Sequence, residues 1–331
     1  GIWDLRDRRK GAKIMTQVEV SHHDPVYNVS WTMSKTMTEF MSVSTDGQVK
    51  WWDTKKMADA PLDTWELDGK DGTPLNISAL CYEATAAPTK FLCGTEQGRT
   101  VNCNKKAKGP NDRITQEYGP AGGGHFGPVV GIARNPFHQK NFITVGDWST
   151  KIWFEDFNKL PIMTSSCSSS FMTCCQWAPN RAGVFFTGAH DGDFCVWDYY
   201  YKQSEPVVKL NVDGGIHCMA VNSSGSLVAT GGNEGTVSLL QLSDSLVESA
   251  DRHEKNVIED MFARELKREK LLEQKYREAK SHKLKPPKVT ETNNPAQMAE
   301  KYMLEETEKN VDKEFFKLLA PGNPDGATET E

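Results

Sequence analysis

The chain has 331 residues, of which 37% are hydrophobic and 25% are charged, so it can bury a sizeable core. Its formal net charge of −6 at pH 7 argues against a nucleic-acid surface, which usually needs a basic patch. No segment is apolar and long enough to span a bilayer, so neither nucleic acid nor a membrane is an expected partner.

A Trp-Asp pair recurs along the first three quarters of the chain. It occurs as Trp3-Asp4, Trp52-Asp53 and Trp197-Asp198, and weaker counterparts occupy the intermediate positions: Cys103-Asn104, Trp153-Phe154 and Leu240-Gln241. The intervals between the six positions are 49, 51, 50, 44 and 43 residues. A period of about 40–50 residues that ends in Trp-Asp is typical of WD40 repeats and predicts an all-β propeller.

The repeat from His23 to Asp53 shows how each unit is built. Alternating apolar residues predict strands at Val26–Trp31, Glu39–Thr45 and Gln48–Trp52, and Asp46-Gly47 predicts the tight turn between the last two. The same order returns four more times, in the following segments: Ile77–Asn104, His125–Trp153, Cys174–Asp198 and Ile216–Gln241.

We therefore expect residues 1–248 to form the propeller, with five full repeats and the end of an earlier one in residues 1–5. The chain begins inside a repeat and without a methionine, so we expect an N-terminal part to be missing. Closed rings commonly have seven blades, and an open set would expose sheet edges. The missing part is therefore expected to hold the remaining blades.

Each blade is expected to contain a hydrogen-bonded network of a His, a Ser or Thr, the turn Asp and the Trp. The candidates are His23, Asp46 and Trp52, then His125, Asp147 and Trp153, and finally Asp191 and Trp197. Such a network satisfies buried polar groups and makes a blade rigid. A Ser-His-Asp set of this kind is structural rather than catalytic, because it repeats with the blades.

Enzymatic chemistry is not expected from this sequence. It has neither the G-x-x-x-x-G-K-[ST] phosphate loop nor the G-x-S-x-G nucleophile motif. Its eight cysteines form no C-x-x-C pair, and no His cluster lies near them at zinc-binding spacing. We therefore predict no catalytic residue, no metal ion and no cofactor.

After the repeats, residues 249–280 are predicted to contain an amphipathic helix, with its core at about 257–280. Its apolar side comprises Ile258, Met261, Phe262, Leu266, Leu272 and Tyr276, although Glu265, Glu269 and Glu273 interrupt it. The helix either packs under the propeller or binds a partner, and its length favours a partner for part of it. Residues 281–331 are expected to be a helical or disordered tail, with a second helical segment at about 295–319.

Several strings in the repeats resemble one family, the WD-repeat intermediate chains of outer-arm axonemal dynein. The strings are Gly47–Met57, Gly94–Gly98, Asn102–Lys108, Arg134–Phe137 and Lys140–Trp148, in which Trp148 replaces the turn glycine. The start of the tail adds Glu254–Val257 and Met261-Phe262, so the resemblance covers about residues 1–275.

This resemblance implies a non-catalytic subunit of the motor of cilia and flagella, located in the cytoplasm and in the axoneme. Such chains pair with a second intermediate chain, and their propellers bind the N-terminal tails of dynein heavy chains. Light chains bind N-terminal extensions, here the missing part, and contact with the microtubule doublets is indirect. The resemblance implies no cofactor.

A different soluble adaptor, such as a substrate receptor of a ubiquitin ligase, is the alternative. Trp3-Asp4-Leu5-Arg6 matches the W-D-x-R pattern of some of these receptors. We favour a solvated charge for Arg6, because a basic residue after Trp-Asp is common in propellers. An enzymatic propeller is a distant third reading, since no acidic or metal-binding residues converge in the sequence.

Overall fold

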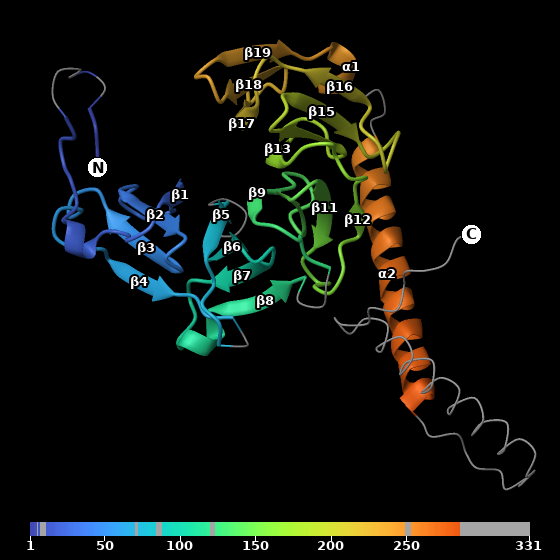
Figure 1. Ribbon diagram of the computed structural model, residues 1–331, viewed down its shortest axis with the longest axis horizontal. Coiled ribbons are helices and arrows are strands. Elements are labelled where there is room, and N and C mark those ends of the chain that lie inside the picture. Colours follow the sequence, from blue (N-terminus) through green and yellow to red (C-terminus); the bar gives the residue numbers. More distant parts are fainter. Residues whose placement is uncertain are drawn as a thin grey trace, which may run out of the picture. The chain divides into compact units, whose positions relative to one another are not determined.

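The computed structural model describes residues 1–4, 6, 11–69, 72–83, 88–119, 123–248 and 253–284. Five antiparallel sheets follow one another along the chain, and Figure 1 shows them arranged side by side in sequence order. The first four have four strands each and the fifth has three. We call them blades 1 to 5. The predicted WD40 propeller architecture is thereby confirmed, and each of the five sheets corresponds to one of the five segments that the sequence indicated as repeats.

Within each blade the strands pair in chain order, so every connection is a hairpin. Blade 1 contains β1 (Val26–Trp31), β2 (Glu39–Ser44), β3 (Gln48–Asp53) and β4 (Asp63–Glu66). Blade 2 contains β5 (Ile77–Cys81), β6 (Lys90–Thr95), β7 (Thr100–Asn104) and β8 (Ile114–Tyr118). Blade 3 contains β9 (Val129–Arg134), β10 (Asn141–Gly146), β11 (Ser149–Phe154) and β12 (Met163–Thr164).

Blade 4 contains β13 (Met172–Trp177), β14 (Val184–Ala189), β15 (Asp193–Asp198) and β16 (Val208–Asn211). Blade 5 contains β17 (Ile216–Val221), β18 (Leu227–Gly232) and β19 (Val237–Gln241). The 3-10 turn η1 (Val18–Val20) precedes β1, a second one, η2 (Pro110–Asp112), lies between β7 and β8, and the short helix α1 (Asp244–Val247) follows β19. The long helix α2 (Glu254–Leu284) comes last.

The core lies between blades rather than inside one sheet. Buried Trp51 and Leu80 join blades 1 and 2, while Tyr118 and Phe142 join blades 2 and 3. The same kind of packing continues between blades 3 and 4 and between blades 4 and 5. A sheet of three or four strands cannot bury both faces alone, so each blade depends on its neighbours for stability.

The two terminal blades carry large exposed apolar side chains. Val29 and Trp31 on β1 are exposed, as are Val237 and Leu239 on β19. Such exposed apolar side chains are typical of a sheet face against which another surface packs. The number of blades in a closed ring remains a prediction.

The chain divides into two compact units, Gly1–Leu272 and Glu273–Glu331, and α2 begins in the first and continues into the second. The predicted helix at 257–280 is confirmed but begins earlier, at Glu254. The expected second helical segment at 295–319 lies outside the described residues. No helix in the described part of the chain combines the length and the apolar character that crossing a membrane requires.

Candidate functional site

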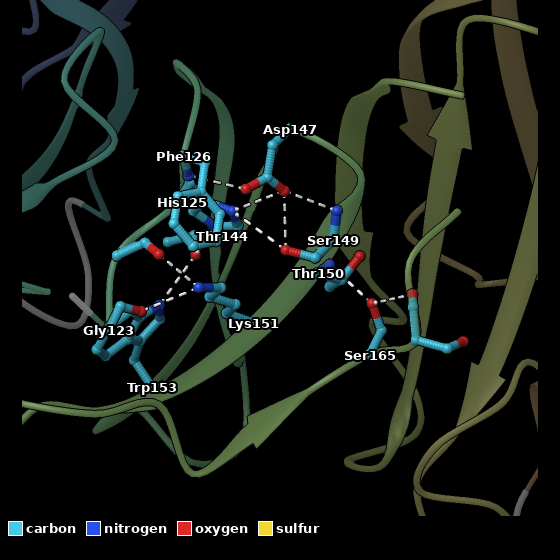
Figure 2. Close-up of polar contacts among 12 residues, drawn as sticks. Gly123, His125, Phe126, Thr144, Asp147, Ser149, Thr150, Lys151, Trp153 and Ser165 are labelled. Carbon is cyan, nitrogen blue, oxygen red and sulfur yellow. Dashed lines mark hydrogen bonds and ion pairs between the residues drawn. The ribbon is translucent and has the colours of Figure 1, made fainter. Parts of the chain in front are cut away.

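Blade 3 contains the predicted polar network in full (Figure 2). The hydroxyl of Thr144 accepts the indole N–H of Trp153 at 2.9 Å and lies 2.8 Å from Nε2 of His125. Nδ1 of the same imidazole lies 3.3 Å from the carboxylate of Asp147. All four side chains are buried. The network therefore links β10, β11 and the segment before β9 into one rigid unit.

Asp147 holds the turn between β10 and β11. Its carboxylate accepts the backbone N–H groups of Phe126 at 2.9 Å and Ser149 at 2.8 Å. Burial alone would raise the pKa of Asp147, but the hydrogen bonds from His125, Phe126 and Ser149 outweigh it and hold the pKa well below its usual value. Asp147 is thus a buried anion with a structural role.

In blade 1 the network uses His22 rather than the predicted His23. Nε2 of His22 lies 2.8 Å from the Ser42 hydroxyl, which also accepts the Trp52 indole at 2.8 Å, and Nδ1 lies 2.9 Å from Asp46. His23 is exposed and contributes only its backbone N–H to Asp46. Of the two consecutive histidines, only His22 is directed at the Ser42 hydroxyl.

The other blades keep parts of the network. In blade 4 the Trp197 indole donates to Thr187 at 2.9 Å, but Asp191 accepts the Ser169 hydroxyl at 3.1 Å instead of pairing with a histidine. In blade 2 the strand register places Cys93 and Cys103 where blades 1, 3 and 4 have Ser or Thr and Trp, and both thiols are buried. The hydrogen-bonded network therefore has a structural role, and its residues differ from blade to blade.

Two buried lysines add further hydrogen bonds to these networks, and they were not predicted from the sequence. Lys151 Nζ donates to the carbonyls of Gly123 and Gly124 at 3.0 and 2.5 Å, and Lys50 makes the equivalent bonds in blade 1. Burial lowers the pKa of both ammonium groups. The signal in the sequence is their position two residues before Trp52 and Trp153. Within the described residues, no group of three or more His, Cys, Asp or Glu is arranged to hold a metal ion.

The first turns of α2 dock on blades 3 and 4. Ile258 and Phe262 are buried in one cluster with Trp177, Phe185 and Tyr199. The Phe262 ring lies 5.0 Å from the ring of Tyr199 and makes an edge contact with His138 at 6.0 Å. Gly183 makes room for the helix, because a Cβ there would lie 2.7 Å from Cδ1 of Ile258.

A buried arginine fixes the start of the helix. Arg181, which lies between β13 and β14, pairs with Asp198 at 2.9 Å and with Glu254 at 3.1 Å, and donates to the Ser245 carbonyl at 3.2 Å. Asp198 is the acidic residue of the blade 4 Trp-Asp pair. Burial raises the pKa of Asp198, although the guanidinium opposes this shift. The sequence analysis did not identify Arg181 or Glu254 as helix anchors.

The docked face of α2 differs from the predicted apolar stripe. It includes Glu265 and Glu269, which are buried and pair with Arg268 at 2.8 and 3.1 Å. In contrast, Leu272 and Tyr276 are 51% and 69% exposed. Of the six predicted partner-binding residues, the first four pack on the propeller and only these last two remain available: Ile258, Met261, Phe262 and Leu266 belong to the docked cluster.

Known proteins resemble this chain over most of its length. A ciliary dynein intermediate chain 3 of Heliocidaris crassispina is 46% identical over 282 residues, which are 84% of this chain and 46% of that protein. The 70 kDa intermediate chain of the flagellar outer arm of Chlamydomonas reinhardtii is 40% identical over 96% of this chain and 54% of that protein. Human dynein axonemal intermediate chain 2 is also 40% identical, with 96% and 52% covered. The chain thus spans about half the length of these relatives.

A protein with low sequence identity also shares the fold of this chain. A chain in a crystal structure of the mitotic checkpoint complex aligns with a TM-score of 0.54 at 15% identity, over 68% of this chain and 64% of that one, which shows the fold alone. The general WD domain, G-beta repeat, matches residues 15–53. The WD40 domain of dynein axonemal intermediate chain 3 matches residues 73–242, about half of the chain. The chain therefore belongs to the family of WD40-repeat intermediate chains of axonemal dynein.

Proposed function

We propose that this chain is a non-catalytic intermediate chain of ciliary or flagellar outer-arm dynein, which acts as a scaffold for arm assembly and ciliary motility. One observation carries the proposal: relatives named as ciliary and outer-arm chains match it across both the blades and the start of the tail. Its place is then the axoneme, after assembly in the cytoplasm. It contributes rigid support, and nucleotide hydrolysis belongs to another subunit.

The proposed partners are the N-terminal tail of a dynein heavy chain and a second intermediate chain. Light chains are a further proposed class of partner, and contact with the doublet microtubules would be indirect. The networks around Thr144 and Ser42 support a scaffold role, because they hold the blades rigid. A rigid surface binds a partner without a large cost in conformational entropy.

Leu272 and Tyr276 are the proposed contacts of α2 with a partner. Both are exposed apolar residues of α2, and we call this pair the strip. The turns that contain Ile258 and Phe262 serve instead to attach the helix to the propeller. The helix thus performs both of the roles that the sequence left open, each with a different segment.

The test is to tag the full-length protein in a ciliated cell, isolate axonemes, extract them with high salt and sediment the extract. Co-migration with dynein heavy chains supports the proposal. Absence from the axoneme, with recovery in a smaller soluble complex, would favour an adaptor of another kind.

The helix contact is tested in the same assay with Leu272→Asp and Tyr276→Asp. Both variants should leave the free energy of unfolding unchanged but reduce the heavy chain that sediments with the tagged chain. Lys267→Asp is the matched control, because Lys267 is an exposed helix residue outside the strip. Normal co-sedimentation of both variants would contradict the proposed role of the strip.

A further inference from the structure

Three aromatic side chains lie exposed at one end of blades 3 and 4. Phe126 is 92% exposed, Phe171 is 54% exposed and Trp148 is 43% exposed. The rings of Trp148 and Phe171 stack with their centroids 4.7 Å apart. We call these three residues the aromatic surface. Large aromatic side chains are among the residues that contribute most of the binding energy at protein interfaces.

The backbone under the aromatic surface is held in place. Trp148 accepts the backbone N–H of Ser168 at 2.7 Å, and the carbonyl of Asp147 accepts that of Met172 at 2.9 Å. The carboxylate of Asp147 binds the N–H of Phe126 (Figure 2). These bonds order the backbone of all three segments, so the backbone has little conformational entropy left to lose on binding.

The turn that carries Trp148 is unlike its counterparts. In blades 1, 2, 4 and 5 a glycine with positive φ lies in the turn between the second and third strands. In blade 3 this turn contains only Asp147 and Trp148, and Asp147 takes the positive φ of 48°. A non-glycine residue in this conformation is strained and is found mostly where the structure overdetermines it. The shorter turn places an indole at its apex, where the other blades have no large side chain.

Two of the turns that contact the segments of the aromatic surface carry an exposed acidic side chain, Glu96 and Asp191. Each of the five equivalent turns contains one Asp or Glu, and the exposed ones are Glu96, Asp191 and Glu234, with Asp213 in the loop before β17. All five turns lie within the described residues, and their only arginine, Arg99, is ion-paired with Glu117 at 2.8 Å. The Glu96 turn contacts the segment of Phe126, since the His125 N–H donates to the Gly98 carbonyl at 2.9 Å. Asp191 follows His190, whose N–H donates to the Phe171 carbonyl at 2.9 Å.

We propose that the aromatic surface is a docking site for a Lys- and Arg-rich amphipathic segment of a partner protein. Apolar side chains of that segment pack on Trp148, Phe171 and Phe126, while its cations face Glu96 and Asp191. Complementary charge steers such a segment and fixes its register, and the aromatic contacts retain it. The inference rests on the proposed function only for the identity of the assembly in which the partner is found.

The experiment places a photoreactive phenylalanine analogue at position 148 of the full-length tagged protein in a ciliated cell. Whole cells are irradiated before fractionation, and the cross-linked peptide is identified by mass spectrometry. Tyr201, an exposed aromatic residue beyond the opposite end of β15, is the matched control position. We expect position 148 to cross-link to a segment with apolar residues flanked by Lys or Arg, and position 201 not to reach that segment.

A second pair of variants tests whether the negative charge of Glu96 contributes to docking. Glu96→Lys should lower the cross-linking yield from position 148 by about tenfold or more, because like charges would then face each other. Glu205→Lys, an exposed position in the loop between β15 and β16, should leave the yield unchanged. An unchanged yield with Glu96→Lys would refute the charge complementarity.

The two proposals fail in different ways. A cross-link from position 148 to a basic segment of a soluble, non-axonemal complex would support the docking site and refute the dynein function. Co-migration with heavy chains, combined with no adduct at position 148 or an adduct on an acidic or uncharged segment, would support the dynein function and overturn the docking site.

Discussion

The substitution Phe262→Ala tests whether the first turns of α2 are part of the folded propeller. Phe262 is 1% exposed and packs against Tyr199 and His138. Truncating a buried Phe to Ala removes its transfer free energy and leaves a cavity, which together cost about 3–5 kcal/mol. We expect a loss of that size in the free energy of unfolding, measured by urea titration and followed by tryptophan fluorescence. Trp177 and Trp197 lie in the same cluster and can report on it.

The matched control is Leu272→Ala on the same helix. Leu272 is 51% exposed, so its truncation should change the free energy of unfolding by no more than about 0.5 kcal/mol. Protease cleavage within residues 254–270 should also become faster in Phe262→Ala and not in the control. If Phe262→Ala lost less than about 1 kcal/mol, or no more than Leu272→Ala, the helix would not be docked as described.

Three further predictions concern the buried polar groups. Arg181→Met leaves Asp198 and Glu254 without their cation, so it should cost about 3–5 kcal/mol in urea unfolding; a loss below about 1 kcal/mol would contradict the anchor. Thr144→Val removes the hydroxyl that bonds the His125 imidazole and the Trp153 indole, so the free energy of unfolding should fall by about 2–4 kcal/mol. A stability equal to wild type would show that water replaces the hydroxyl. Because the folded-state pKa of Asp147 is lowered, its contribution is present above the unfolded-state pKa near pH 4 and is lost as pH falls below it. The difference in unfolding free energy between wild type and Asp147→Asn should therefore shrink below about pH 4, and a constant difference would refute this origin.

The blades could be predicted because their signals are local. β1 was placed at Val26–Trp31, as observed, and Met41, Val43 and Trp51 are buried as the alternation in β2 and β3 indicates. The turn glycine Gly47 has a φ of +78°, the conformation that the sequence pattern implies. Strand alternation and turn chemistry act over a few residues, so a single sequence is enough to read them.

The docked face of α2 could not be predicted in the same way. Its contact with the propeller depends on Arg181, which lies 73 residues before Glu254 in the chain. A hydrophobic stripe treats Glu265 and Glu269 as interruptions, yet both lie on the buried face because arginines pair with them. The prediction of His23 in place of His22 was wrong for a related reason, since the sequence does not show which of two adjacent histidines faces Ser42 and Asp46.

The aromatic surface and the attachment site of α2 lie at opposite ends of the same strands. β14 begins at Val184, next to Gly183 and the docked turn of α2, and ends at Ala189, next to the turn that contacts Phe171. Five strand steps separate these ends by about 17 Å. Changes at sites this far apart usually act additively. A partner on the aromatic surface and the attachment of α2 therefore do not compete for the same part of the blade.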